Sequence, residues 1–292
     1  MRLATLSFCN DIDFADWSSY QEVHRCLREE FGLAVEDSFW LFDPLGSEMA
    51  LFKTTMRDKG PYHNEILADI RDGRLTILHA GGNFDHNTGF QPSRGLLAEG
   101  LDYLRRHAQV PAIWTNHGDE GNVQNIGWAG GNYQQGDAPS SDAFILDILL
   151  QHGVRFFWTD QHTSNDFVFA APGRPGQKIL RKEMTRAGFT INGFARYRGP
   201  LPKAPDAETL GKQISQTHVE DLIAERGDVV IYQHWCVHRT TAGKPLTARA
   251  PIFPSESHNA LRMLARFRDR QQLRVLPLLD LLQEHALLAA VA

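Results

Sequence analysis

Acids and histidines follow several apolar runs of this chain, at the points where those runs end. Asp11 and Asp13 come after the run Leu3–Phe8, and His79 and His234 close two later runs. Carboxylates and imidazoles bind divalent metals and move protons in hydrolytic reactions. Their repeated placement after apolar runs predicts one hydrolytic site rather than scattered polar residues.

The two acids of the first group are spaced for a shared task. Residues two apart in an extended segment point to the same face, so both carboxylates of Asp11 and Asp13 would face one site. One could then hold a metal while the other takes a proton from water. An Asp-rich turn that caps the following helix, helped by Asp16, explains the same spacing equally well.

A second group predicts metal ligands. His86 lies seven residues after His79, and Gly81 and Gly82 between them allow the backbone to fold back. Two imidazoles and a carboxylate leave open positions on a metal, as catalytic sites do. Asn83 is a weaker candidate ligand or a substrate contact. The plain alternative is that His79 ends a strand and His86 lies on a surface loop.

Two further strand ends carry candidates for substrate contact and catalysis. We expect His117 to bond substrate or a metal-bound water, with Asn116 orienting it. Turn chemistry also favours Asn, Gly and Asp at this point. Asp160 follows another strand and is a candidate substrate ligand.

The late apolar run ends in the best candidate for a proton donor. His234 follows the apolar residues Val229–Ile231, and an imidazole there is placed as a general acid for a leaving group. Cys236 is interpreted as a packing residue. Trp128 and Trp235 are expected either in the core or at the mouth of a sugar-binding site.

The elements between these residues alternate between strand and helix. This order predicts an α/β protein with a parallel sheet, closed as a (β/α) barrel whose strand ends meet at one mouth. The 292 residues fit one such domain, with an insertion at about 161–205. The predicted strands are 3–8, 38–42, 75–78, 112–115, 154–159, 166–171, 193–197, 228–232 and 274–277. The predicted helices are 18–31, 64–71, 93–107, 141–152, 208–226, 258–270 and 278–288.

Composition narrows the class of protein. The net charge is −5 and no basic block stands out, which disfavours nucleic acids and anionic membranes as partners. Three separated cysteines predict neither a disulfide framework nor a zinc knuckle. The N-terminus is typical of a strand rather than a signal peptide, and no apolar run is long enough for a transmembrane helix. We therefore expect a soluble, cytoplasmic protein, whose oligomeric state the sequence leaves open.

The order of these motifs resembles the polysaccharide deacetylase superfamily, which has NodB homology and is similar to carbohydrate esterase family 4. The resemblance runs from about Leu3 to Leu282 and is strongest to the branch found in O-antigen and other surface-polysaccharide gene clusters. The motifs that carry it are, in order, Asp11–Asp13, His79–His86, Thr115–Gly118, Trp158–Asp160 and Ile231–His234.

The resemblance implies a distorted (β/α) barrel of seven or eight strands with one divalent metal, often zinc. It implies removal of an acetyl group from a sugar or polysaccharide intermediate, and the absence of an export signal favours a nucleotide- or lipid-linked one. Asp11 would be the general base, and Asp13 and His79 metal ligands. His234 would be the general acid.

Two departures from the family pattern keep other functions open. Asn83 stands where the family has its second histidine, so His86, His117 or Asn83 itself would complete the metal shell. The third motif, at Asn116–Gly118, lacks the family's arginine and proline. One alternative is a glycan-binding descendant without catalysis. The other is a metal-dependent amide or glycoside hydrolase that uses Asp11, Asp13 and Asp160.

Overall fold

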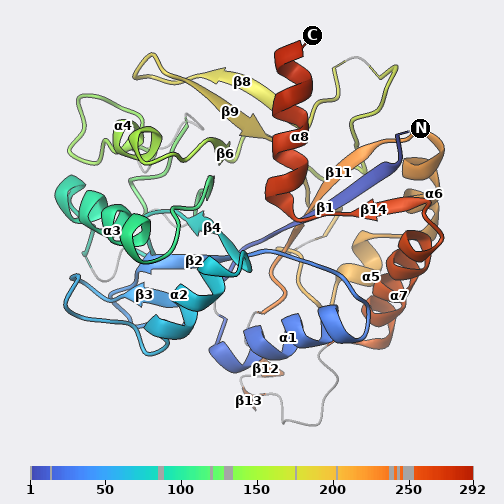
Figure 1. Ribbon diagram of the computed structural model, residues 1–292, viewed down its shortest axis with the longest axis horizontal. Coiled ribbons are helices and arrows are strands. Elements are labelled where there is room, and N and C mark those ends of the chain that lie inside the picture. The colour runs from blue at the N-terminus through green and yellow to red at the C-terminus, as the bar shows by residue number, and fades with distance from the viewer. Residues whose placement is uncertain are drawn as a thin grey trace. The chain divides into compact units, whose positions relative to one another are not determined.

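The computed structural model describes residues 2–13, 15–84, 89–118, 121–127, 134–174, 176–201, 203–236, 240–241, 244–245 and 253–291 (Figure 1). The described chain is a mixed α/β structure and divides into two compact units. Unit 1 comprises residues 1–35, 163–179 and 195–292, and unit 2 comprises 36–162 and 180–194. Each unit contains one sheet made mostly of parallel strands, which confirms the predicted α/β class.

Unit 1 is organised around a parallel five-stranded sheet in the order β14-β1-β11-β10-β7. Its strands are β1 (Ala4–Asn10), β7 (Thr163–Ser164), β10 (Arg196–Tyr197), β11 (Asp228–Gln233) and β14 (Leu273–Val275). β1 is buried along its whole length. Such a run is typical of a central parallel strand covered on both faces.

The helices of unit 1 correct two sequence-based boundaries. They are α1 (Trp17–Glu29), α5 (Leu210–Gln213), α6 (Gln216–Ala224), α7 (Ser255–Asp269) and α8 (Leu278–Val291). The helix predicted at 18–31 begins one residue earlier and ends two residues earlier, and Asp16 caps it, because its carboxylate accepts the backbone N–H of Ser19 at 2.7 Å. The single helix predicted at 208–226 is two helices, since Ile214 is extended and Ser215 caps α6.

Unit 2 contains a seven-stranded sheet in the order β3-β2-β4-β5-β6-β9-β8. Its strands are β2 (Asp37–Phe42), β3 (Ala50–Phe52), β4 (Leu75–His79), β5 (Ile113–Thr115), β6 (Phe156–Trp158), β8 (Leu180–Met184) and β9 (Thr190–Phe194). All pairs are parallel except the β8–β9 hairpin. Its helices are α2 (His63–Arg71), α3 (Arg94–His107) and α4 (Leu146–Gln151).

The middle of the chain differs most from the sequence-based expectation. The segment at 166–171 makes only an isolated bridge, between Ala170 and Asp228, instead of a strand. The β8–β9 hairpin was not predicted, and β10 is the end of the strand expected at 193–197. Residues 163–179 and 195–205 belong to unit 1, whereas 180–194 belong to unit 2.

A third sheet has two short antiparallel strands, β12 (Thr240–Thr241) and β13 (Lys244–Pro245).

Among the described helices, none combines the length and apolarity needed to cross a lipid bilayer.

Candidate active site

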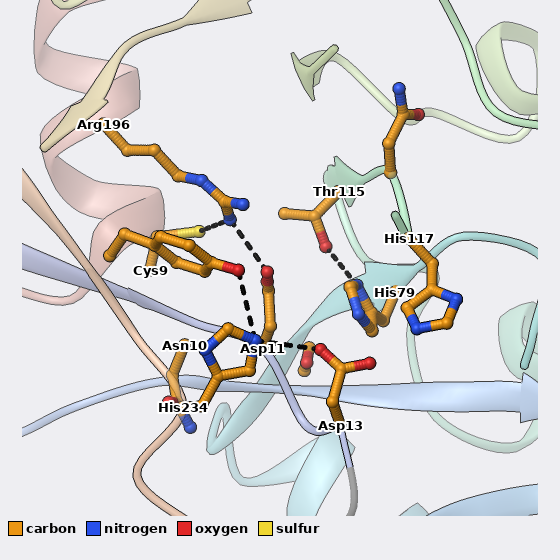
Figure 2. A network of polar contacts seen from close by, with 12 residues as sticks. Cys9, Asn10, Asp11, Asp13, His79, Thr115, His117, Arg196 and His234 are labelled. Atoms are coloured by element: carbon orange, nitrogen blue, oxygen red, sulfur yellow. Dashed lines mark hydrogen bonds and ion pairs between the residues drawn. The ribbon is translucent and has the colours of Figure 1, made fainter. Parts of the chain in front are cut away.

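In unit 1, the ends of two neighbouring strands bring three of the predicted residues together (Figure 2). β1 and β11 are paired in parallel with Asn10 opposite Gln233, and the backbone N–H of Asp11 donates to the Gln233 carbonyl at 2.9 Å. Asp11 and His234 therefore follow paired residues at adjacent carboxyl ends. We call Asp11, Asp13 and His234 the carboxylate–histidine group.

His234 is held at both ring nitrogens. Its Nε2 lies 3.0 Å from Oδ2 of Asp13, and its Nδ1 lies 3.1 Å from the carbonyl oxygen of Pro205. A carbonyl oxygen can only accept, so Nδ1 carries a proton. Because Nε2 faces a carboxylate, the arrangement favours an imidazolium with N–H groups on both sides.

The surroundings of His234 act on its pKa in opposite directions. Burial would lower the pKa of this imidazole, but the hydrogen bond and the charge of Asp13, with the charge of Asp11, outweigh burial and raise the pKa above its usual value. The histidine predicted as a general acid is thus one whose protonated form the fold favours.

A buried arginine holds the other acid. Nη1 of Arg196 donates to Oδ2 of Asp11 at 3.0 Å, and the two side chains are 1% and 2% exposed. The same nitrogen lies 3.7 Å from Sγ of Cys9. The guanidinium also covers the ring of Tyr232, with 3.4 Å between its central carbon and the ring centre. These contacts fix the orientation of the Asp11 carboxylate.

Tyr232 links the two pairs. Its hydroxyl lies 3.1 Å from Nε2 of His234. Burial, followed by the charge of Asp11, raises the pKa of Tyr232 well above its usual value, so the side chain stays a neutral phenol. A neutral phenol next to the Asp13–His234 pair can donate or accept a hydrogen bond as the imidazole changes its charge.

The donor set of this group suits a divalent cation. Asp11, Asp13 and His234 each offer a ligand atom within 4.8 Å of the others. Carboxylate oxygens and imidazole nitrogens are ligands that zinc and related ions accept. His234 already faces acceptors at both nitrogens, which makes the two carboxylates the better ligands of the three.

Unit 2 brings His79 and His117 together at the ends of β4 and β5. Nδ1 of His79 lies 2.8 Å from Oγ1 of Thr115, its partner in the β4–β5 register. The two imidazole centres are 5.1 Å apart, and the ring of Trp40 contacts both. Asn122 donates to Nδ1 of His117.

Asn116 and Asp160 form an internal network in unit 2. The Asn116 carbonyl oxygen accepts from Trp114 and from the N–H of Ile126, both at 2.9 Å. Its amide nitrogen donates to the Ile126 carbonyl and to Oδ2 of Asp160. Gln134 donates to the same carboxylate oxygen at 3.0 Å. Both predicted substrate contacts are thus engaged in holding the loop after β5.

The remaining predicted residues have varied surroundings. The Asn83 side chain faces the Asp43 carboxylate at 3.5 Å. Trp235 is 2% exposed and lies edge-on against Phe8, with 4.6 Å between ring centres, so its surroundings are those of a core residue. His86 and Trp128 lie outside the described residues.

Sequence reasoning missed Arg196 and Tyr232. Arg196 is the ion-pair partner of Asp11. It comes from β10, and 185 positions separate it from that partner. The one local signal was an arginine among the apolar residues of the strand predicted at 193–197, where a buried charge needs a partner.

Comparison with known proteins leaves the chain without an assigned family. No family model matches it, and no curated protein matches it either.

Proposed function

We propose that this protein is a metal-dependent hydrolase that removes an acetyl group from a sugar or polysaccharide intermediate. The observation that carries the proposal is the carboxylate–histidine group, with Asp11 fixed by buried Arg196 and His234 paired with Asp13. Hydrolysis of an acyl group uses a general base and a general acid, and here each candidate has a partner that holds it. We include in the proposal the resemblance to polysaccharide deacetylases and the distorted (β/α) barrel that it implies.

Each residue of the group has a separate role in this reaction. Asp11 accepts a proton from the attacking water, whose oxygen bonds to the acetyl carbon. His234 gives its Nε2 proton to the departing sugar nitrogen or oxygen as the bond to the acetyl carbon breaks. The products are acetate and the deacetylated sugar. Arg196 keeps the Asp11 carboxylate oriented, and Tyr232 stays hydrogen-bonded to His234.

The metal is proposed from the donor chemistry and the resemblance. The resemblance implies Asp13 and His79 as its ligands. When bound, a divalent ion would polarise the acetyl carbonyl and acidify a water molecule. A nucleotide- or lipid-linked sugar and a cytoplasmic location remain part of the proposal.

Acetate release from a panel of N- and O-acetylated sugars tests the proposal. Replacing a general acid or base costs on the order of 10²–10⁴-fold in rate, so Asp11→Asn and His234→Gln should fall by that amount. Asp58→Asn, an exposed acid of unit 2, is the matched control and should keep full activity. Sugar release without acetate would instead identify a glycoside hydrolase. Sugar binding without turnover would identify a binding protein.

A further inference from the structure

One face of α7 carries three exposed arginines at intervals of four residues. They are Arg262, Arg266 and Arg270, the last being the residue that caps the helix. Helix residues four apart are neighbours about 6 Å from each other. The three side chains, which we call the arginine row, therefore start from a line of roughly 12 Å.

The arginines of the row lack the acid partner that many other arginines of the protein have. Within the described ranges, none of its members forms an ion pair with a carboxylate, and Arg262 instead lies 3.4 Å from Nδ1 of His258. Many arginines elsewhere are bound to an acid, among them Arg25, Arg74, Arg94, Arg105, Arg174, Arg186, Arg196, Arg268 and Arg274. The row is thus a local excess of positive charge on a chain whose net charge is −5.

Two hollows flank the row. One, of about 460 Å³, lies between α7 and the end of α1 and is lined by the whole row. The other, of about 420 Å³, lies where α7 meets α5 and the start of α6, and Arg262 and Arg266 line it as well. Figure 1 shows α7 beside α5 in unit 1. Both volumes fall within the range of small-molecule sites.

The acids near the row do not cancel its charge. Glu30 and Asp269 line the first hollow, but Glu30 lies 3.3 Å from His258 and Asp269 pairs with Arg268. Glu256 lines the second hollow. Three arginines face two carboxylates in the first hollow, one of which is already paired with Arg268, and two arginines face Glu256 in the second, so each hollow keeps a positive surplus.

The second hollow also receives the first turn of α6. Ser215, the cap of this nine-residue helix, and Gln216 are among its lining residues. The N-terminal end of a helix carries partial positive charge and favours anions. It adds to the two arginines that line the same hollow.

We propose that the arginine row is a binding site for a small molecule that carries two or more linked phosphate groups. Guanidinium groups bind phosphate oxygens in pairs, and several arginines in line match several phosphates better than one. The concave hollows favour a compact ligand. The net negative charge of the chain disfavours a nucleic acid or an anionic membrane as the occupant.

Titration calorimetry with tripolyphosphate, ADP and orthophosphate tests this site on the full chain. We expect tripolyphosphate and ADP to bind more tightly than orthophosphate. The double variant Arg262→Gln/Arg266→Gln should weaken tripolyphosphate binding at least tenfold. Arg57→Gln/Arg106→Gln removes the same charge from exposed positions of unit 2 and should bind as the parent does. Melting curves confirm that each variant is folded.

Three results would overturn the proposal. The first is no binding of any of the phosphate probes. The second is equal weakening in both double variants, which would mean a diffuse charge effect. The third is row-dependent binding to vesicles that contain anionic lipid while the soluble phosphates fail to bind, which would make the surface a membrane contact.

Discussion

The strand ends of unit 1 and those of unit 2 carry similar polar residues but use them differently. In unit 1 the polar groups are ionisable and paired by charge, Arg196 with Asp11 and His234 with Asp13. In unit 2 the Asn116 amide uses its hydrogen bonds to hold the loop after β5 in place. A polar residue at a strand end therefore indicates catalysis only when its hydrogen-bond partners leave it able to transfer a proton or to bind a metal or substrate.

The largest effect should come from removing the buried cation of unit 1. Arg196→Met leaves the Asp11 carboxylate buried without its partner, and breaking such a pair costs about 3–5 kcal/mol of unfolding free energy. Urea unfolding measures this loss. Arg196→Met/Asp11→Asn should recover part of it, because no uncompensated charge remains. Arg57→Met, at an exposed position, is the control. If Arg196→Met is as stable as this control, the Arg196–Asp11 pair does not stabilise the fold.

A smaller loss is expected from the amide network of unit 2. Asn116→Ala leaves the Trp114 N–H and the Ile126 N–H without their acceptor, and an unsatisfied buried group costs about 1–3 kcal/mol. Asn64→Ala, an exposed position of α2, should stay within about 0.5 kcal/mol of the parent. Urea unfolding and metal content are measured together. A variant that unfolds normally but loses bound metal would move Asn116 into the functional site.

Two buried histidines should make the free energy of unfolding depend on pH in opposite directions, and we expect this effect to be the smallest. The pKa of His234 is raised above its ordinary value of 6.5, so its contribution to stability is complete below pH 6.5 and is lost as pH rises through the folded pKa. Burial lowers the pKa of His63, whose Nε2 bonds to Tyr103 at 2.8 Å in unit 2. Its contribution is lost as pH falls below 6.5, because the unfolded chain takes up the proton first.

Melting temperatures of metal-free protein between pH 5 and pH 9 separate these contributions. His234→Gln should flatten the alkaline side of the profile, and His63→Gln the acid side. If either substitution changes the opposite side, the charge assignment of that histidine is wrong.

Sequence patterns correctly predicted several strands of the repeated strand–helix order. The strands predicted at 3–8 and 228–232 are the adjacent parallel strands β1 and β11, which is why Asp11 and His234 lie close together. The same logic gave β4, β5 and β14 within a residue or two. Each of these strands follows a predicted helix, and this repeated order locates even a short strand.

Sequence patterns failed where partners are distant or elements are short. Nothing local marks Arg196 as the partner of Asp11, because the contact joins two strands far apart in the chain. β3 has only three residues, and β8 alternates too weakly, with exposed Arg181 and Lys182, to be distinguished from a loop. The break before α6 depends on Ser215 acting as a cap, a role that tertiary packing selects.

The central claim is that Asp13 belongs to a metal-dependent reactive site. Elemental analysis of protein purified without chelator or affinity tag tests it most directly, with Asp13→Ala and His79→Ala beside Asp58→Asn as control. We expect about one equivalent of zinc or a similar ion in the parent and the control, and its loss in both alanine variants. A parent protein that contains no metal and takes none up on addition would contradict the claim.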